Sequence, residues 1–121
     1  MATTDQVDVR FEGSLPILRV ENMEASVRFY VDLLGFQNAV WGTNDFTCVS
    51  RGGASMYLCR QDQGRGAAWV WIGVDNAEKL HEEYRARGVK IRLPPTKFQW
   101  ALEFQVEDPD NNVLRIGSEP K

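Results

Sequence analysis

The side chains that most often bind metals or act as nucleophiles are scarce in this chain of 121 residues. It contains one histidine, His81, and two cysteines, Cys48 and Cys59. The cysteines form no CxxC pair, and with a single histidine they are too few for a zinc knuckle or a disulfide framework. We therefore interpret both cysteines as small strand residues and expect His81 on the outside of a helix.

Aromatic side chains, in contrast, are plentiful: the chain has four tryptophans, three tyrosines and six phenylalanines. Trp69 and Trp71 alternate with Val70 and Ile72, as in a strand whose aliphatic face packs under a helix. The two tryptophans then belong to the opposite, concave face of the strand. They either fill the interior of a barrel or form the walls of a binding pocket.

Charged side chains on the same concave face favour the pocket. The period-two pattern puts Arg19, Glu103 and Arg115 there, and a dry core would not tolerate such groups unpaired. Glu103 is the one strand carboxylate expected to reach the cavity. It could act as a general base or as the ion-pair partner of Arg19 or Arg115.

An internal repeat indicates which elements position these residues. The segment 16–24 resembles the segment 70–78, which lies 54 positions later, and each reads as a short strand that leads into a helix. Asn22 and Asn76 are suited to cap the two helices, and Gly35 and Gly88 are suited to end them.

Each helix is followed by three runs typical of strands, separated by turn residues such as Gly52-Gly53 and Pro94-Pro95. The expected strands are Phe36–Trp41, Phe46–Arg51, Ala54–Cys59, Val89–Leu93, Ala101–Glu107 and Val113–Ile116. The sequence therefore predicts an α+β fold of two βαβββ modules, about 15–60 and about 67–117, in a single domain spanning 1–121. Residues 1–14 form either a frayed tail or an extra edge strand, because Val7, Val9 and Phe11 alternate.

Charge and hydropathy exclude several partners. The 14 basic and 17 acidic residues leave a net charge of −3, and the basic residues form no stripe that could follow a nucleic-acid backbone. The longest apolar stretch, 67–74, is too short to span a bilayer. We expect a cytoplasmic protein that binds neither nucleic acid nor membrane and mildly attracts a cationic ligand.

Two segments resemble the signatures of a known superfamily. The segment Leu18–Phe36 resembles the opening signature of the glyoxalase/bleomycin-resistance/extradiol-dioxygenase superfamily, also called the vicinal-oxygen-chelate fold. The segment Glu107–Arg115 resembles its closing "DPxGN" signature, with Asn111 where a glycine is usual. The likeness runs from about Leu15 to Ile116, and it implies a homodimer whose clefts form between the subunits.

The resemblance also implies where a metal would bind. Enzymes of the superfamily hold a divalent metal at positions that correspond here to Leu15, Tyr57, Trp69 and Arg115. None of these is a usual metal ligand, and Arg115 would place a fixed positive charge at the site. We therefore expect no metal, no cofactor and no catalytic residue.

Within the superfamily, bleomycin-resistance proteins are the members most similar to this chain, through the segments Asn44–Arg51, Ala68–Trp71 and Gln99–Asp110. This resemblance implies non-catalytic binding and sequestration of a small, cationic aromatic molecule, such as a bleomycin-family antibiotic, and hence antibiotic resistance. The candidate ligand-binding residues are Phe46, Trp69, Trp71, Trp100, Glu103, Asn111 and Arg115. The alternatives are a lyase or dioxygenase-type enzyme with Glu103 as base, and a structural dimer without a ligand.

Overall fold

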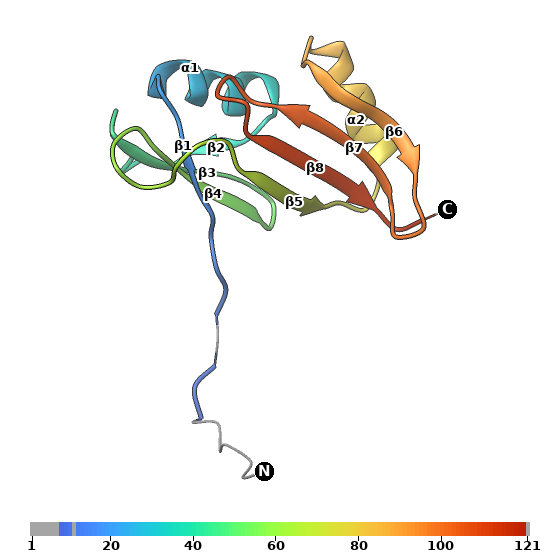
Figure 1. Ribbon diagram of the computed structural model, residues 1–121, viewed down its shortest axis with the longest axis horizontal. Helices are drawn as coiled ribbons and strands as arrows, with labels where there is room; N and C mark the ends of the chain where they lie inside the picture. The colour runs from blue at the N-terminus through green and yellow to red at the C-terminus, as the bar shows by residue number, and fades with distance from the viewer. Residues whose placement is uncertain (1–7, 11, 121) are drawn as a thin grey trace.

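The structure is a computed structural model that describes residues 8–10 and 12–120. Its strands form two four-stranded sheets, with the orders β1-β4-β3-β2 and β5-β8-β7-β6. β1 runs parallel to β4, and β5 runs parallel to β8; the other neighbouring strands are antiparallel. The strands are β1 (Ile17–Arg19), β2 (Gln37–Asn38), β3 (Phe46–Arg51), β4 (Ala54–Cys59), β5 (Trp69–Gly73), β6 (Ile91–Lys97), β7 (Leu102–Glu107) and β8 (Val113–Ser118). The predicted α+β class, with one βαβββ unit in each half, is confirmed (Figure 1).

Asparagine caps start both helices, as predicted. Asn22 Oδ1 accepts a hydrogen bond from the Ala25 N–H at 3.0 Å, at the start of α1 (Met23–Arg28). Asn76 does the same for Lys79 at the start of α2 (Ala77–Ala86). The first helix continues from α1 into a π-helical turn, η1 (Phe29–Leu33), before the chain leaves it.

One hydrophobic core lies between the helices and the sheets and spans both halves of the chain. Alternate strand residues reach it: Leu18, Met56 and Leu58 from the first sheet, and Phe104 and Leu114 from the second. All five are at most 1% exposed. Because the helices cover this face, the other residues of each strand point to the opposite face of the sheets.

The turn between β7 and β8 ties the second half to the first helix. Asp108 is only 5% exposed, and its carboxylate accepts hydrogen bonds from the Tyr30 hydroxyl at 2.9 Å and from the Asn112 side chain at 2.9 Å. The backbone N–H groups of Asp110 and Asn112 donate to its other oxygen. Burial raises the pKa of Asp108, while these hydrogen bonds act in the opposite direction.

The same turn also binds the strands of both halves. Asn112 donates to the Arg19 carbonyl at 3.3 Å and accepts from the Ala68 N–H at 2.8 Å. Asp110 accepts from the Glu21 N–H at 3.0 Å. The closing segment that carries the family resemblance is therefore a structural joint between β1, α1 and β5.

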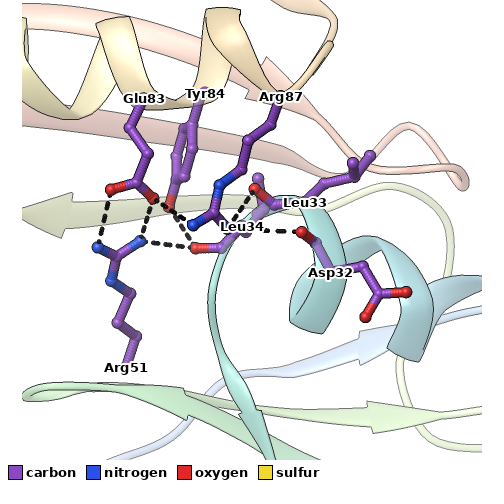
Figure 2. A network of polar contacts seen from close by, with 7 residues as sticks. All are labelled: Asp32, Leu33, Leu34, Arg51, Glu83, Tyr84 and Arg87. Atoms are coloured by element: carbon purple, nitrogen blue, oxygen red, sulfur yellow. Dashed lines mark hydrogen bonds and ion pairs between the residues drawn. The ribbon is translucent and has the colours of Figure 1, made fainter.

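A second joint links the end of the first helix to α2, and Figure 2 shows it from close by. Arg51 donates to the Leu34 carbonyl at 2.8 Å and to both Glu83 oxygens, at 2.9 and 3.3 Å. The Tyr84 hydroxyl donates to the same carbonyl at 2.9 Å, and Arg87 adds a longer contact with Glu83. The Arg51 guanidinium lowers the pKa of Glu83.

Two strand predictions were wrong in their bounds. Pro94-Pro95 was expected to break the chain, but β6 runs through both prolines with register shifts against β7. Because β6 is an edge strand, the missing proline N–H groups cost no ladder hydrogen bond there. The strand expected over Phe36–Trp41 is reduced to Gln37–Asn38.

Residues 8–10 and 12–16 contain no strand, and Val9 is exposed. Val7 and Phe11, which favoured an extra strand, lie outside the described residues. In the part of the chain that the structure describes, no helix is long and apolar enough to cross a membrane.

Candidate ligand-binding face

We call the side of the two sheets opposite the helices the open face. It is built from alternate residues of the strands, as the pairing registers require. In the first sheet the open face carries Ile17, Arg19, Phe46, Cys48 and Tyr57, and in the second it carries Trp69, Trp71, Arg92, Glu103, Gln105 and Arg115.

All four tryptophans of the chain belong to this face or its rim, and all are about half exposed. The exposed fractions are 59% for Trp41, 54% for Trp69, 47% for Trp71 and 59% for Trp100. Tryptophan side chains are highly buried on average, so four half-exposed indoles on one side of the sheets make this surface a candidate binding site.

In the first sheet, three rings form an aromatic cluster that consists of Trp41, Phe46 and Tyr57. The ring centroids of Phe46 and Tyr57 are 5.1 Å apart, and Trp41 stacks on Phe46 at 6.4 Å with an interplanar angle of 23°. Gly42 makes this possible, because a Cβ there would clash with the Thr47 hydroxyl as the turn brings Trp41 back over β3.

In the second sheet, Glu103 is the centre of the polar contacts. Arg115 donates to both of its oxygens, at 2.8 and 3.0 Å, Gln105 donates at 2.8 Å, and the Trp100 indole N–H donates at 3.1 Å. The side chain is only 1% exposed. Hydrogen bonding by Arg115 lowers the pKa of Glu103 to about 2, so the carboxylate is ionised at neutral pH and is a weak base.

Two arginine–tryptophan pairs flank this centre. The guanidinium carbon of Arg115 lies 5.3 Å from the ring centroid of Trp71, and that of Arg92 lies 4.7 Å from the ring centroid of Trp69. Arg92 also donates to the Gln105 side chain, which in turn donates to Glu103. Gln105 therefore connects the two pairs into one network across β6, β7 and β8.

The position of the Trp71 ring depends on a glycine in the neighbouring strand. A Cβ at Gly117 would clash with the outer edge of the indole. Gly117 pairs with Gly73 in the register of β5 and β8, two residues beyond Trp71 and Arg115. The absence of a side chain at Gly117 lets the indole lie across the strands beside Arg115, whereas a Cβ at Gly73 would make only an ordinary contact with it.

The structure brings most, but not all, of the sequence-predicted site residues together. Trp71, Trp100, Glu103 and Arg115 share direct contacts, and Trp69 joins them through the second arginine pair. Phe46 lies on the other sheet, in the aromatic cluster.

Asn111 is exposed in the turn between β7 and β8, with a left-handed φ of 66°. This backbone conformation explains why a glycine is usual at the position. Asp45, just before β3, is paired with Arg60 at 2.9 Å.

Sequence reasoning missed Arg92 and Gln105. The period-two pattern places Gln105 on the same face of β7 as Glu103, but it gave no sign that Gln105 would link Arg92 to Glu103. Arg92 was hidden because the strand was ended at Pro94-Pro95, which left its position relative to β7 undefined.

The residues at the positions where the superfamily holds a metal do not fit a divalent cation. Trp69 has no lone pair to offer, and Arg115 is a cation already bound to Glu103. Tyr57 is held among the rings of the aromatic cluster, and Leu15 is aliphatic. Within residues 8–10 and 12–120, no three His, Cys, Asp or Glu side chains are grouped so that they could hold a metal ion.

Comparison with known proteins agrees with the fold. A family model described as the Glyoxalase/Bleomycin resistance protein/Dioxygenase superfamily matches residues 10–116. A search of curated proteins found no match.

Several solved structures are similar to the chain over most of its length. The bleomycin-binding protein from bleomycin-producing Streptomyces verticillus, solved with copper(II)-bleomycin, is 29% identical with a TM-score of 0.69, covering 91% of this chain and 98% of that one. TioX from Micromonospora sp. ML1 is 16% identical with a TM-score of 0.74, over 91% and 98% of the two chains. A lactoylglutathione lyase from Agrobacterium tumefaciens is 13% identical with a TM-score of 0.70, over 88% and 92%. The last two likenesses show the fold alone.

Proposed function

Since this chain belongs to the glyoxalase/bleomycin resistance protein/dioxygenase superfamily, we propose that it binds and sequesters a small, cationic aromatic molecule on its open face. The guest is a bleomycin-family antibiotic or a compound of similar chemistry, and it leaves chemically unchanged. The observation that carries the proposal is the group of four half-exposed tryptophans on one side of the sheets.

The indoles are held in place before any guest arrives. Trp69 and Trp71 are paired with arginines, Trp100 stacks on Phe98 with 4.5 Å between centroids, and Trp41 stacks on Phe46. Rings fixed in this way lose little conformational entropy on binding. Each stacking contact is worth about 0.5–1.5 kcal/mol beyond the area it buries.

The two halves of the open face suit different parts of such a guest. Among the described residues, only Trp69 and Trp71 have a protein cation over the ring. The aromatic cluster of the first sheet is therefore the better place for a cationic group of the guest. The arginine-paired indoles are better suited to its planar, uncharged part.

The polar groups of the face support binding over catalysis. Glu103 has its carboxylate oxygens occupied by four hydrogen bonds and a pKa lowered to about 2, which makes it unsuitable as a general base near neutral pH. The proposal assigns Phe46, Trp69, Trp71, Trp100 and Arg115 to contact with the guest, with a backbone contact at Asn111. Glu103 holds Arg115 and Trp100 in position.

We place the protein in the cytoplasm as a homodimer, in which the open faces form clefts between the subunits. The exposed indoles favour this arrangement, because a partner would cover part of a face that is unusually apolar for a monomer's surface. Sedimentation of the purified protein at the mass of a dimer is the expected result.

The test is a titration with bleomycin, both metal-free and loaded with copper(II), followed by calorimetry and by mass spectrometry of the recovered compound. We expect saturable binding and recovery of bleomycin with unchanged mass. Trp69→Leu and Trp100→Leu should each weaken binding by about tenfold, the equivalent of one stacking contact. Arg85→Ala, an exposed change on α2, serves as the control and should bind normally. Conversion of the compound, or an affinity of both tryptophan variants equal to that of the unaltered protein, would contradict the proposal.

A further inference from the structure

A cavity lies at the free edge of β5, between the turn that joins β3 to β4 and the junction of β5 with α2, and Trp71 of the open face is among the residues that line it. Its volume is about 630 Å³, in the range of small-molecule sites. Phe36, Ile72, Leu80 and Tyr84 contribute apolar walls, and Lys79 and Asp75 lie at its polar side.

The internal repeat explains why the cavity exists. Strands β3 and β7 correspond to each other, as do β4 and β8, and all four have six residues. The turn between β7 and β8 spans residues 108–112, whereas the turn between β3 and β4 consists of Gly52-Gly53 alone. The longer turn bonds to the end of β1 and the start of the first helix, whereas the two-residue turn lines the cavity at the start of α2.

We call the half in which the longer turn bonds to β1 and the first helix the filled half. Its hydrogen bonds show which backbone groups have no such partner at the start of α2. In the filled half, the Glu21 N–H donates to the Asp110 carboxylate, and the Arg19 carbonyl accepts from the Asn112 amide. Their counterparts, 54 positions later, are the Asp75 N–H and the Gly73 carbonyl, and both residues line the cavity.

These backbone groups are directed away from the sheet. Val74 donates to the Gly117 carbonyl and Ala68 accepts from the Val113 N–H, so the even-numbered residues of this segment bond to β8. The alternation of a parallel ladder turns the carbonyl of Gly73 and the N–H of Asp75 to the free edge of β5. Outside the strand ladder, neither group has a backbone hydrogen-bond partner among the described residues.

Charge and shape at the cavity define what could replace the missing turn. Lys79 forms no ion pair with a described residue, whereas the nearby Glu83 is already bound by Arg51. Leu80 corresponds in the repeat to Ser26 of the first helix, whose hydroxyl contacts the Asp110 carboxylate. The cavity thus combines a free cation, a donor and acceptor pair on one strand edge, and an apolar wall in place of a polar one.

We propose that this cavity is a second binding site, for a small carboxylic acid that carries an amide and an aliphatic group, the chemistry of an N-acylated amino acid. Its carboxylate takes the place of the Asp110 carboxylate, against the Asp75 N–H and Lys79. Its amide N–H donates to the Gly73 carbonyl, and its aliphatic group packs on Leu80 and Phe36. The Asp75 side chain does not prevent this, since its acidic counterpart Glu21 accommodates Asp110 in the filled half.

The probe is N-acetyl-L-leucine, which has no ring to stack on the open face, and its uncharged amide is the matched control ligand. Binding is measured by calorimetry with the full chain. We expect N-acetyl-L-leucine to bind and its amide to bind at least about tenfold more weakly, because the amide lacks the charged hydrogen-bonding group. Lys79→Ala should weaken the acid by about tenfold and leave the amide unaffected. Arg85→Ala, which removes a cation further along the same helix, should change neither affinity.

A second variant tests the geometry directly. Replacing Gly52-Gly53 with Asp-Pro-Asp-Asn-Asn, the turn of the other half, should fill the cavity and abolish binding of the acid. Trp69→Leu and Trp100→Leu should leave this binding intact, which separates it from capture on the open face. The proposal is overturned if N-acetyl-L-leucine does not bind at millimolar concentration, if Lys79→Ala binds it normally, or if the tryptophan variants lose it.

Discussion

Glu103 accepts hydrogen bonds from Arg115, Gln105 and Trp100, while its own side chain is almost completely buried. A carboxylate that is buried and bound by an arginine can hold the surrounding groups in position, but it is not accessible to a ligand. The period-two pattern of its strand was enough to predict its face, and it left Arg19 and Arg115 as alternative partners, of which the structure shows Arg115. It could not predict the burial, because Trp100 covers Glu103 from a turn outside the strands.

Stability in acid should depend on this carboxylate. Its pKa is lowered from the ordinary 4.5 to about 2 in the folded protein, so the unfolded chain binds the additional proton between these values. The stabilisation is complete above about pH 4.5 and is lost as the pH falls toward 2, by up to about 3 kcal/mol. Urea unfolding at pH 7 and pH 3 should show that Glu103→Gln removes much of the acid sensitivity of the unaltered protein. Glu82→Gln, an exposed change on α2, should keep it, and an equal pH dependence in all three proteins would count against the network.

At the scale of elements, the two turns that follow β3 and β7 have different roles. The longer turn holds the halves together through Asp108, Asp110 and Asn112, and the shorter one leaves a cavity. The sequence revealed the repeat, the helix caps and most strands, because these depend on local spacing. It did not reveal the joint or the cavity, because both depend on which distant strand edge each turn meets. The continuation of β6 through Pro94-Pro95 could not be predicted from local spacing either, because prolines are tolerated there only since β6 lies at the edge of its sheet.

The joint should be sensitive to Asn112, whose side chain is fully buried and bonds to Arg19, Ala68 and Asp108. Asn112→Ala leaves these buried groups without partners and should lower the free energy of unfolding by about 3 kcal/mol. Asn111→Gly, one residue earlier, is the matched control. It relieves a left-handed φ of 66° and should leave stability unchanged or slightly raised. Urea unfolding of both variants checks this, and a loss of similar size in the two would show that the turn acts through its conformation instead of its side-chain contacts.

At the scale of the whole molecule, the helices and core occupy one side of the sheets and the indoles occupy the other. This division follows from the alternation of residue types along the strands. Aliphatic residues alternate with tryptophans along β5, and apolar residues alternate with polar or charged residues along much of β7 and β8. Superfamily membership fixes the scaffold but not the function, because the same fold supports lyases, dioxygenases and binders. The function proposed above therefore rests on the side chains of the open face. Here its side chains form a layer of rings and paired ions.

The most direct measurement follows the indole N–H signals of the four tryptophans by nitrogen-edited NMR while bleomycin is added. We expect the signals of all four indoles to shift together and reach saturation, while the backbone signals of α2 stay in place. Saturable shifts along α2 with unmoved indole signals would show that the guest binds on the helical side, and the assignment of the open face would then be wrong.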